Sequence, residues 1–201
     1  MTKVAIIDYG VGNLHSIRRG IELAGADARV TSELAEIEAA DAIVLPGVGA
    51  FESAMEGLKN KLDVIREVVQ AGKPLLGICL GMQLLLERSE EGNGDGMNLI
   101  PGEVVRLSQG LKVPHMGWNS LELRREHPIL AGIASGSYMY FVHSYYARPE
   151  NSSTILATTG YGVEFPSIIA QGSIIGVQFH PEKSSKLGLQ LLQNFVGMVK
   201  G

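Results

Sequence analysis

Cysteine is nearly absent from this sequence of 201 residues, which contains a single copy. One cysteine cannot form an intrachain disulfide, and it leaves no Cys-x-x-Cys pair for zinc binding or thiol–disulfide exchange. Basic residues are also scarce. There are 17 Lys and Arg against 21 Asp and Glu, so the net charge of −4 gives no basic footprint for nucleic acid. We therefore set aside disulfide scaffolds, zinc modules and polyanion-binding proteins.

Long apolar runs are missing too. The stretch 4–7 near the N-terminus is too short for the hydrophobic region of a signal peptide, and no other run has the length that a bilayer crossing needs. With 45% apolar and 19% charged residues, the composition is that of a globular protein. The sequence has no repeat, low-complexity tract or linker. We expect residues 1–201 to form one domain in the reducing cytoplasm.

The first half of the sequence alternates apolar strands with amphipathic helices. Its apolar runs are continuous, as expected for parallel strands that are buried on both faces. The predicted strands are 4–9, 42–45 and 74–78. The predicted helices are 13–24, 51–58, 62–71 and 80–88.

The second half changes character after a polar, glycine-rich loop at 89–98. Short strands follow at close spacing, which favours antiparallel pairing. They are predicted at 103–107, 120–123, 138–143, 154–158, 167–170 and 173–178, before an amphipathic helix at 185–199. The predicted fold class is therefore α/β, with an open, mostly parallel sheet flanked by helices and an antiparallel extension in the second half.

The single cysteine stands in the segment Gly77-Ile78-Cys79-Leu80-Gly81, where an apolar strand runs directly into a predicted helix. This is the pattern of a nucleophile elbow, with sulfur in place of the more common serine hydroxyl. Small flanking residues allow the close backbone approach of such a turn, and the start of a helix favours the thiolate. A lone cysteine after an apolar strand is also a common small core residue, so catalysis additionally requires a base.

A candidate base ends the last predicted strand, at His180-Pro181-Glu182. Residues two apart on an extended chain project to the same side, so His180 and Glu182 can touch, with Pro181 helping to fix the extended conformation. The carboxylate can then hold one ring nitrogen while the other takes a proton from sulfur. If both strands end at one edge of a parallel sheet, Cys79 meets His180. A strand-end histidine beside a solvated glutamate is the alternative interpretation.

Glycine-bearing turns follow two other strands. The turn at 46–49 can aim backbone N–H groups at an oxyanion, although an ordinary strand–helix turn has the same pattern. The segment Gly10-Val11-Gly12 fails as a dinucleotide motif, because His15 stands where the third glycine belongs. The sequence has no His-Glu-x-x-His or paired-cysteine spacing. We predict neither a metal nor a cofactor.

These patterns together resemble the class I (triad) glutamine amidotransferases. The elbow followed by Gln83, the turn at 46–49 and the terminal His180-Pro181-Glu182 carry the resemblance to the family. Further stretches, spread over nearly the whole chain, resemble the branch of the family that supplies ammonia for histidine biosynthesis. These stretches are 8–13, 80–83, 114–119, 140–145 and 178–185.

The resemblance implies a glutaminase. Cys79 would attack the side-chain amide of L-glutamine, His180 would move protons and Glu182 would orient His180. A γ-glutamyl thioester would release ammonia and then glutamate. The backbone groups implied for the oxyanion are those of Val48, Gly49 and Leu80. The residues implied in glutamine binding are Gly49, Gln83, Ser144 and Tyr145.

The resemblance also implies a partner, a cyclase subunit built as a (β/α)8 barrel, with which the chain would form a heterodimer. Ammonia would reach it by a protected route, and the cyclase would form imidazole glycerol phosphate and an aminoimidazole carboxamide ribotide. The residues at the family's interface positions are Asn13, Trp118, Tyr140 and Lys183. Taken singly, the last three also suit core or solvated positions. His115 and His143 are predicted to be structural.

Other functions remain open on the sequence. One is the glutaminase of another amidotransferase, serving pyridoxal phosphate or anthranilate synthesis, which identification of the partner would separate. A second is a γ-glutamyl hydrolase or cysteine peptidase, which needs no partner. A third is a regulatory binding module with an inactive triad, which measurable glutamine turnover would exclude.

Overall fold

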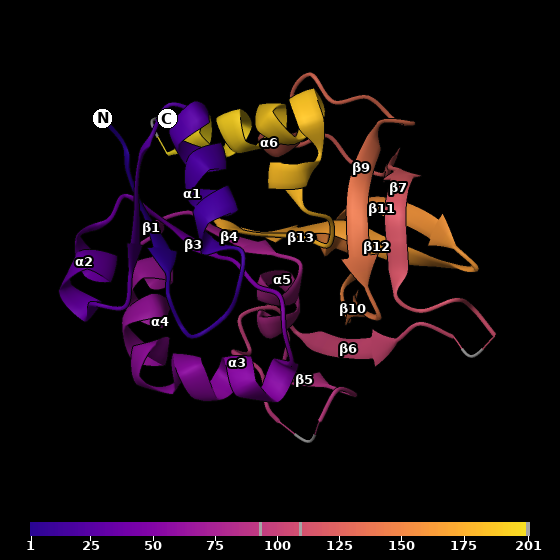
Figure 1. Ribbon diagram of the computed structural model, residues 1–201, viewed down its shortest axis with the longest axis horizontal. Coiled ribbons are helices and arrows are strands. Elements are labelled where there is room, and N and C mark those ends of the chain that lie inside the picture. The colour runs from indigo at the N-terminus through magenta and orange to yellow at the C-terminus, as the bar shows by residue number, and fades with distance from the viewer. Residues whose placement is uncertain (93, 109, 200–201) are drawn as a thin grey trace.

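The computed structural model describes residues 1–92, 94–108 and 110–199. Asn93 of the predicted loop at 89–98 and the last two residues of the predicted domain lie outside the described residues. A sheet lies between two layers of helices, and a lobe of antiparallel strands continues from one side of it (Figure 1). The predicted fold class is confirmed. None of the helices in the described ranges combines the length and apolar character that a membrane crossing requires.

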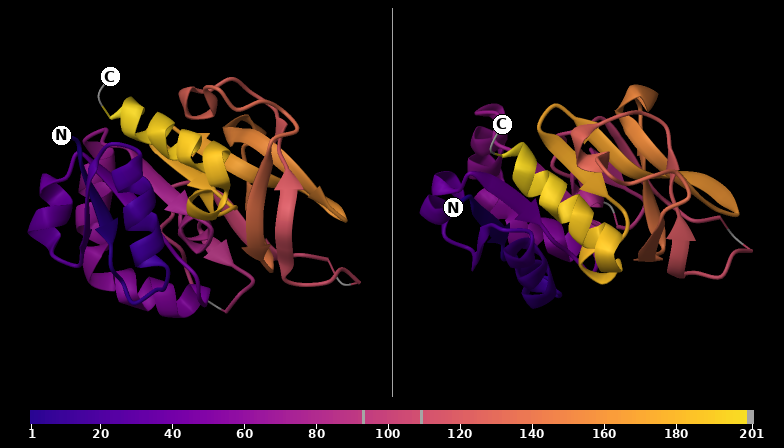
Figure 2. Two further views of the ribbon diagram at one scale, coloured as in Figure 1. Left: turned by 45° about the horizontal axis from the view of Figure 1, so that its top comes forward. Right: turned by 90° about the horizontal axis from the view of Figure 1, so that it is seen from above.

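The helices cover both faces of the main sheet. On one face, two helices that are far apart in the sequence lie side by side (Figures 1 and 2), namely α1 (Leu14–Leu23) and α6 (Ser185–Met198). The other face is covered by α2 (Leu34–Ala39), α3 (Phe51–Leu58), α4 (Leu62–Gln70) and α5 (Leu80–Leu84). Single 3-10 turns occupy Lys59–Lys61 (η1), Pro128–Leu130 (η2), Ser152–Thr154 (η3) and Pro181–Lys183 (η4).

Within the described residues the main sheet has eight strands, in the order β2-β1-β3-β4-β13-β12-β11-β8. The parallel part consists of β2 (Asp27–Thr31), β1 (Lys3–Ile7), β3 (Ala42–Leu45), β4 (Leu75–Ile78) and β13 (Ile174–Val177). The antiparallel continuation consists of β12 (Val163–Gln171), β11 (Ile155–Tyr161) and β8 (Glu122–Leu123).

The parallel strands are apolar throughout because both of their faces are buried. Successive side chains point to opposite faces, so Ile6 packs in the core beneath α1 and α6, whereas Ile7 packs in the core above α3 and α4. β4 and β13 pair with Ile78 opposite Val177, and the next residues, Cys79 and Gln178, leave the sheet at the same edge. This pairing brings two segments that are distant in the sequence together at the site.

Two smaller sheets complete the lobe. One contains β10 (Tyr145–Pro149), β6 (Gly102–Arg106) and β5 (Arg88–Ser89), and the other pairs β7 (His115–Ser120) with β9 (Tyr138–His143). The sequence did not predict β2, α2, β5, β7 and β10 as separate elements, and the strand predicted at 120–123 joins the end of β7 to β8. β2 is a half-exposed edge strand and α2 has six residues, so neither produces a clear hydrophobic period.

The helix predicted at 80–88 is too long, because α5 ends at Leu84. The carbonyl groups that would continue it are taken by another segment, with Met97 N–H donating to Leu84 O at 2.8 Å and Leu99 N–H donating to Leu85 O at 2.9 Å. The close approach requires Gly96, where a Cβ would lie 2.1 Å from Leu86 O. Pairing with the 96–99 segment thus replaces the last helical turn.

Candidate active site

Cys79 lies at a sharp turn between β4 and α5. Its φ of 53° and ψ of −107° are a strained combination for a residue with a side chain. The two flanking glycines permit the turn, since a Cβ on Gly77 would lie 2.6 Å from Gly81 O and one on Gly81 would lie 1.9 Å from Leu45 O. The sequence pattern of the elbow therefore corresponds to a steric requirement at each glycine.

The cavity beside Cys79 has a volume of about 290 Å³, which is at the lower end of the range for small-molecule sites. Its lining joins the turn after β3, the start of α5 and the segment between β9 and β10. The lining residues are Val48, Gly49, Cys79, Leu80, Gln83, Glu91, Pro114, Val142, His143, Ser144 and Tyr145. All the residues implied in glutamine binding and in the oxyanion site are among them.

His180 and Glu182 form a buried pair behind the cysteine. His180 Nδ1 lies 2.8 Å from Glu182 Oε1, and both side chains are fully buried. The extended backbone predicted for this segment is wrong, because Pro181 begins the 3-10 turn η4 and His180 precedes it. The fixed φ of Pro181 suits the first position of a helical turn, which folds Glu182 back onto the ring. Asn13 Nδ2 also donates to Glu182 Oε1, at 2.5 Å.

The second ring nitrogen of His180 is directed away from Glu182 and is buried. Among the described residues, neither His180 Nε2 nor Glu182 Oε2 has a hydrogen-bond partner. Burial lowers the pKa of His180, but its interactions with Cys79 and Glu182 outweigh burial and raise the pKa to about 9. The geometry leaves Nε2 free to exchange a proton with a group beside Cys79.

The turn at 46–49 contributes Val48 and Gly49 to the lining of the cavity. Tyr9 donates its hydroxyl to Pro46 O, and burial raises the pKa of Tyr9, with a further electrostatic contribution from the neighbouring Cys79. Gly49 has a φ of 140°, which a residue with a side chain rarely adopts, and Val48 is 38% exposed. The turn therefore depends on a backbone conformation that suits glycine at position 49, and it lies beside Leu80, the first residue of α5.

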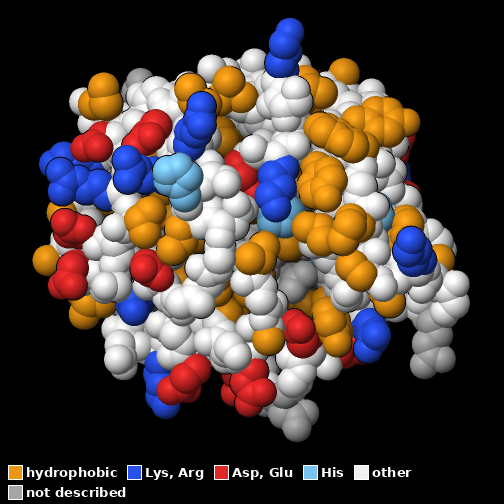
Figure 3. All heavy atoms as spheres, viewed as in Figure 1, with side chains coloured by type: hydrophobic (Ala, Val, Ile, Leu, Met, Phe, Trp, Pro, Cys, Tyr) orange, Lys and Arg blue, Asp and Glu red, His pale blue; other side chains and the backbone are white. Residues whose placement is uncertain are grey.

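The positions implied for the interface fall into two groups. On β7 and β9, alternate side chains point outward and form what we call the β7–β9 face, whose residues are Met116, Trp118, Tyr138 and Tyr140. Trp118 is 52% exposed and meets Tyr140 edge to face at 6.0 Å. Figure 3 shows hydrophobic side chains gathered over this side of the molecule.

The other two implied interface residues adjoin the buried pair. Lys183 is exposed at the end of η4, whereas Asn13 is partly buried and directs its amide at Glu182. The backbone N–H of His180 donates to Tyr140 O at 2.9 Å, so β9 is bonded directly to the segment that holds the imidazole. The candidate interface residues are thus within one or two contacts of His180.

Sequence reasoning missed two polar residues. Glu91 lines the cavity and accepts the N–H of Phe51, the first residue of α3, at 3.2 Å. Gln178 is fully buried, and its Nε2 lies 3.7 Å from Cys79 Sγ. A polar residue at the end of an apolar strand is the signal that could have indicated Gln178. The position of Glu91 depends on a loop and has no comparable signal.

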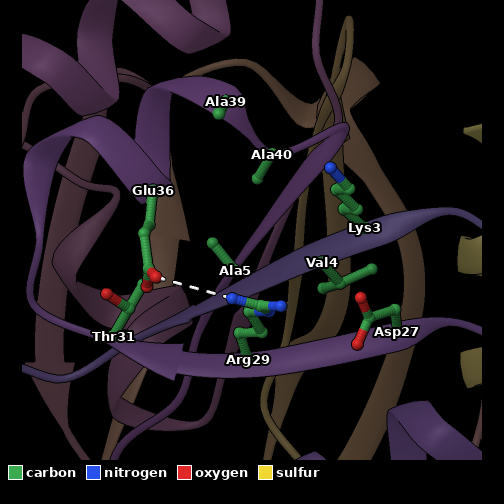
Figure 4. A pocket seen from close by; sticks show the side chains of 9 residues that line it. All are labelled: Lys3, Val4, Ala5, Asp27, Arg29, Thr31, Glu36, Ala39 and Ala40. Carbon is green, nitrogen blue, oxygen red and sulfur yellow. Dashed lines mark ion pairs between the residues drawn. The ribbon is translucent and has the colours of Figure 1, made fainter.

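His115 and His143 are buried and bonded to each other, with His115 Nδ1 and His143 Nε2 2.9 Å apart. The described residues contain no group of three or more His, Cys, Asp or Glu side chains that could hold a metal ion. A separate hollow beside β2 is lined by residues such as Lys3, Asp27 and Glu36, with Arg29 paired to Glu36 (Figure 4). None of the predicted site residues lies in that hollow.

Comparisons with known proteins agree on one family. The family model described as glutamine amidotransferase class-I matches residues 5–198. A relative named imidazole glycerol phosphate synthase subunit HisH, from Natronomonas pharaonis, is 52% identical, and the match covers 96% of this chain and 94% of that protein. The protein of the same name from Moorella thermoacetica is 50% identical, with 100% and 97% covered.

A solved structure has the same fold at low sequence identity. It is a putative GMP synthase subunit from Thermoplasma acidophilum, and it superposes with a TM-score of 0.75 at 20% identity. The match covers 100% of this chain and 94% of that one.

Proposed function

The chain belongs to the class I glutamine amidotransferase family, and we propose that it hydrolyses L-glutamine to glutamate and ammonia as the glutaminase subunit of an imidazole glycerol phosphate synthase. We further propose that residues 1–201 are a single glutaminase domain, in line with the family match over 5–198. The observation that carries the reaction is the placement of the only cysteine, at a strained elbow that faces a cavity and stands beside the buried pair of His180 and Glu182.

Glutamine would occupy the cavity beside Cys79. Polar groups there suit an amino acid, because Gly49, Ser144 and Tyr145 offer main-chain groups and Gln83 offers a carboxamide at the wall. Glu91 contributes a carboxylate to the lining, which suits the α-ammonium group of the substrate. The side-chain amide of glutamine would then point toward the sulfur.

The chemistry follows from the three proposed catalytic groups. Cys79 Sγ attacks the amide carbon and His180 Nε2 carries the proton to the leaving nitrogen, so the C–N bond breaks and ammonia departs from a γ-glutamyl thioester. Water then attacks the thioester, gives its proton to His180 and releases glutamate and the thiol. Glu182 holds Nδ1 of His180, and the raised pKa of His180 favours the imidazolium that stabilises a thiolate.

Backbone N–H groups would stabilise the oxyanion formed in both steps. We assign this role to Leu80, at the start of α5, and to Val48 or Gly49, in the adjacent turn that also lines the cavity. One such donor typically contributes about 10²–10³-fold to turnover. The unusual φ of Gly49 supports this assignment, because it sets the direction of the backbone N–H groups in the turn.

The partner would be a cyclase subunit with a (β/α)8 barrel, in a heterodimer. The β7–β9 face is an exposed apolar and aromatic surface of the kind found at the centre of interfaces, and Lys183 adds a charge close by. The hydrogen bond from His180 to β9 and that from Asn13 to Glu182 give the partner a short route to the catalytic pair. Ammonia would pass directly to the cyclase, and hydrolysis would accelerate when the cyclase holds its substrate.

The test is glutamate release from glutamine by the purified chain and by Cys79→Ala, each with and without a cyclase subunit that carries its bound substrate. We expect activity that needs Cys79 and rises sharply with the loaded partner. Equal inactivity of the chain and the complex would contradict the proposal. Equal activity of the isolated chain and the complex would contradict the coupling. Partner-independent cleavage of γ-glutamyl peptides would indicate a hydrolase instead.

A further inference from the structure

A continuous line of buried and partly buried hydrogen bonds ends at the sulfur of Cys79. It begins at Asn119 on β7, passes through two histidines and a backbone carbonyl, and reaches the sulfur through two glutamine side chains. The groups in order are Asn119, His115, His143, the carbonyl of Tyr145, Gln83, Gln178 and Cys79. The four side chains between Asn119 and Cys79 are each at most 5% exposed.

We propose that Gln178 stabilises the thiolate of Cys79 by donating an amide N–H to Sγ, and that Gln83 is the positioning residue that fixes this orientation. The inference rests on the proposed function, in which Cys79 reacts as a thiolate. Gln178 Nε2 lies 3.7 Å from Sγ, a distance suited to the large sulfur atom. Gln178 does not line the cavity, so its contact is with the sulfur and not with the substrate.

The orientation of Gln178 follows from the donors and acceptors along the line. The carbonyl of Tyr145 can only accept, so Gln83 must present its Nε2, which lies 2.8 Å away. The same nitrogen lies 3.3 Å from Gln178 Oε1, and this contact turns the amide nitrogen of Gln178 toward the sulfur. The reversed amide would place two donors against each other and leave an acceptor facing a thiolate.

The two histidines fix which atoms donate and which accept at the Asn119 end of the line. Asn119 Nδ2 lies 3.2 Å from His115 Nε2, and an amide nitrogen only donates, so His115 carries its proton on Nδ1. His115 then donates to His143 Nε2, and His143 Nδ1 donates to Tyr145 O at 2.8 Å. Burial lowers the pKa of both histidines, which keeps them neutral and preserves this pattern at physiological pH.

The sulfur also has a competing neighbour. Sγ lies 3.7 Å from Val142 O, a carbonyl that favours the protonated thiol. Gln178 is the neutral side chain that offsets it, since an N–H donor favours the charged sulfur. Removing the donor while keeping the volume should therefore shift the balance toward the thiol without disturbing substrate binding.

The experiment measures the rate of alkylation of Cys79 by iodoacetamide as a function of pH. The reagent reads out one site, because the chain has one cysteine. The variants are Gln178→Met, which removes the donor, and Gln178→Glu, which keeps an oxygen for Gln83 and places a second oxygen against the sulfur. The matched control is Ser167→Ala on the neighbouring strand β12, where Ser167 is equally buried and its Oγ has no partner among the described residues.

We expect both Gln178 variants to raise the apparent pKa of the thiol by about one unit, so that alkylation below the midpoint slows about tenfold. Ser167→Ala should keep the parent profile. In the complex with the cyclase, Gln178→Met should lower kcat for glutamine about tenfold with little change in KM. Unchanged alkylation midpoints in both variants, or the same shift in Ser167→Ala, would overturn the inference. Alkylation needs no glutamine, so a shift of the alkylation midpoint can be observed even if the chain has no glutaminase activity. Equally, glutaminase activity can be observed even if the alkylation midpoint does not shift.

Discussion

Replacing Gly81 with alanine tests whether the backbone at the elbow is as tightly constrained as the structure indicates. Gly81 lies in α5, two residues after Cys79, and its α-carbon faces the carbonyl of Leu45 at the end of β3. A Cβ there would lie 1.9 Å from Leu45 O, about 1.5 Å inside the 3.4 Å at which ordinary contact begins. The neighbour is a backbone carbonyl, which cannot rotate away as a side chain can.

The clash should be costly for both stability and activity. Overpacking of a tight site costs typically 1–3 kcal/mol, and a backbone neighbour places this substitution at or above about 3 kcal/mol. The strain must push α5 away from β3, and α5 starts at Leu80, whose N–H is assigned to the oxyanion. We therefore expect the free energy of unfolding to fall by about 3 kcal/mol and glutaminase activity to be lost.

The assay is urea unfolding followed by circular dichroism, in which a loss of about 3 kcal/mol lowers the midpoint by roughly 1 M or more. Gly197→Ala is the matched control. Gly197 is an exposed residue of α6, a Cβ there would have no neighbour within 4 Å, and alanine should stabilise the helix by about 0.5–1 kcal/mol. A Gly81→Ala protein within about 0.5 kcal/mol of the parent would refute the steric reasoning at the elbow.

Further predictions concern the buried pair, the histidine line and the surface. Glu182→Gln should lower kcat about 10³–10⁴-fold, because the amide no longer fixes the ring of His180, and steady-state kinetics in the complex would measure it. The pKa of His180 is raised to about 9 from 6.5, so the stability that His180 gains from its interactions with Cys79 and Glu182 is complete below about pH 6.5 and is lost as the pH rises toward 9. Urea unfolding of the parent and Glu182→Gln across this range should show that the difference between their free energies of unfolding becomes smaller as the pH rises. A difference that stays constant would argue against the assignment. Burial lowers the pKa of His143 to about 3, so the parent should lose stability as the pH falls from 6.5, and His143→Gln should show a flatter dependence in the same unfolding assay. Trp118→Ala should weaken binding of the cyclase by about 2 kcal/mol or more, measured by calorimetry, with the alkylation profile of Cys79 unchanged; undiminished affinity would place the interface elsewhere.

The predictable parts of the fold are those in which a local pattern and a tertiary requirement coincide. The strands at 42–45 and 138–143 and the helix at 51–58 have the predicted bounds. Each has a continuous or alternating apolar pattern and a clear end. The antiparallel lobe is recognisable from its short, closely spaced strands, but their partners are not, because pairing depends on long-range contacts.

The candidate site also has features that local sequence patterns predict and features that depend on long-range contacts. A glycine on each side of Cys79 is a local signal, and each glycine proves to face a backbone carbonyl. The sequence predicts the proximity of His180 and Glu182 from an extended chain, yet it arises from a 3-10 turn, so two different backbones bring residues two apart together. Gln178 and Glu91 have contacts that join segments separated by 99 and 40 residues, so a local pattern can mark Gln178 as a polar residue at a strand end but cannot give the partner of either residue.

The pairing of β4 with β13 has a consequence for how the protein is made. The cysteine and the groups that activate it are 99 or more residues apart in sequence, and the whole antiparallel lobe lies between them. During synthesis the N-terminal parallel strands can assemble long before β13 leaves the ribosome, but the thiol then has neither its base nor its amide donor. A nascent or truncated chain is therefore expected to carry an unactivated cysteine, and reactivity arises when the last strand is inserted. Lengthening the loops of the lobe would slow that closure only weakly, because the entropy of closing a loop grows with the logarithm of its length.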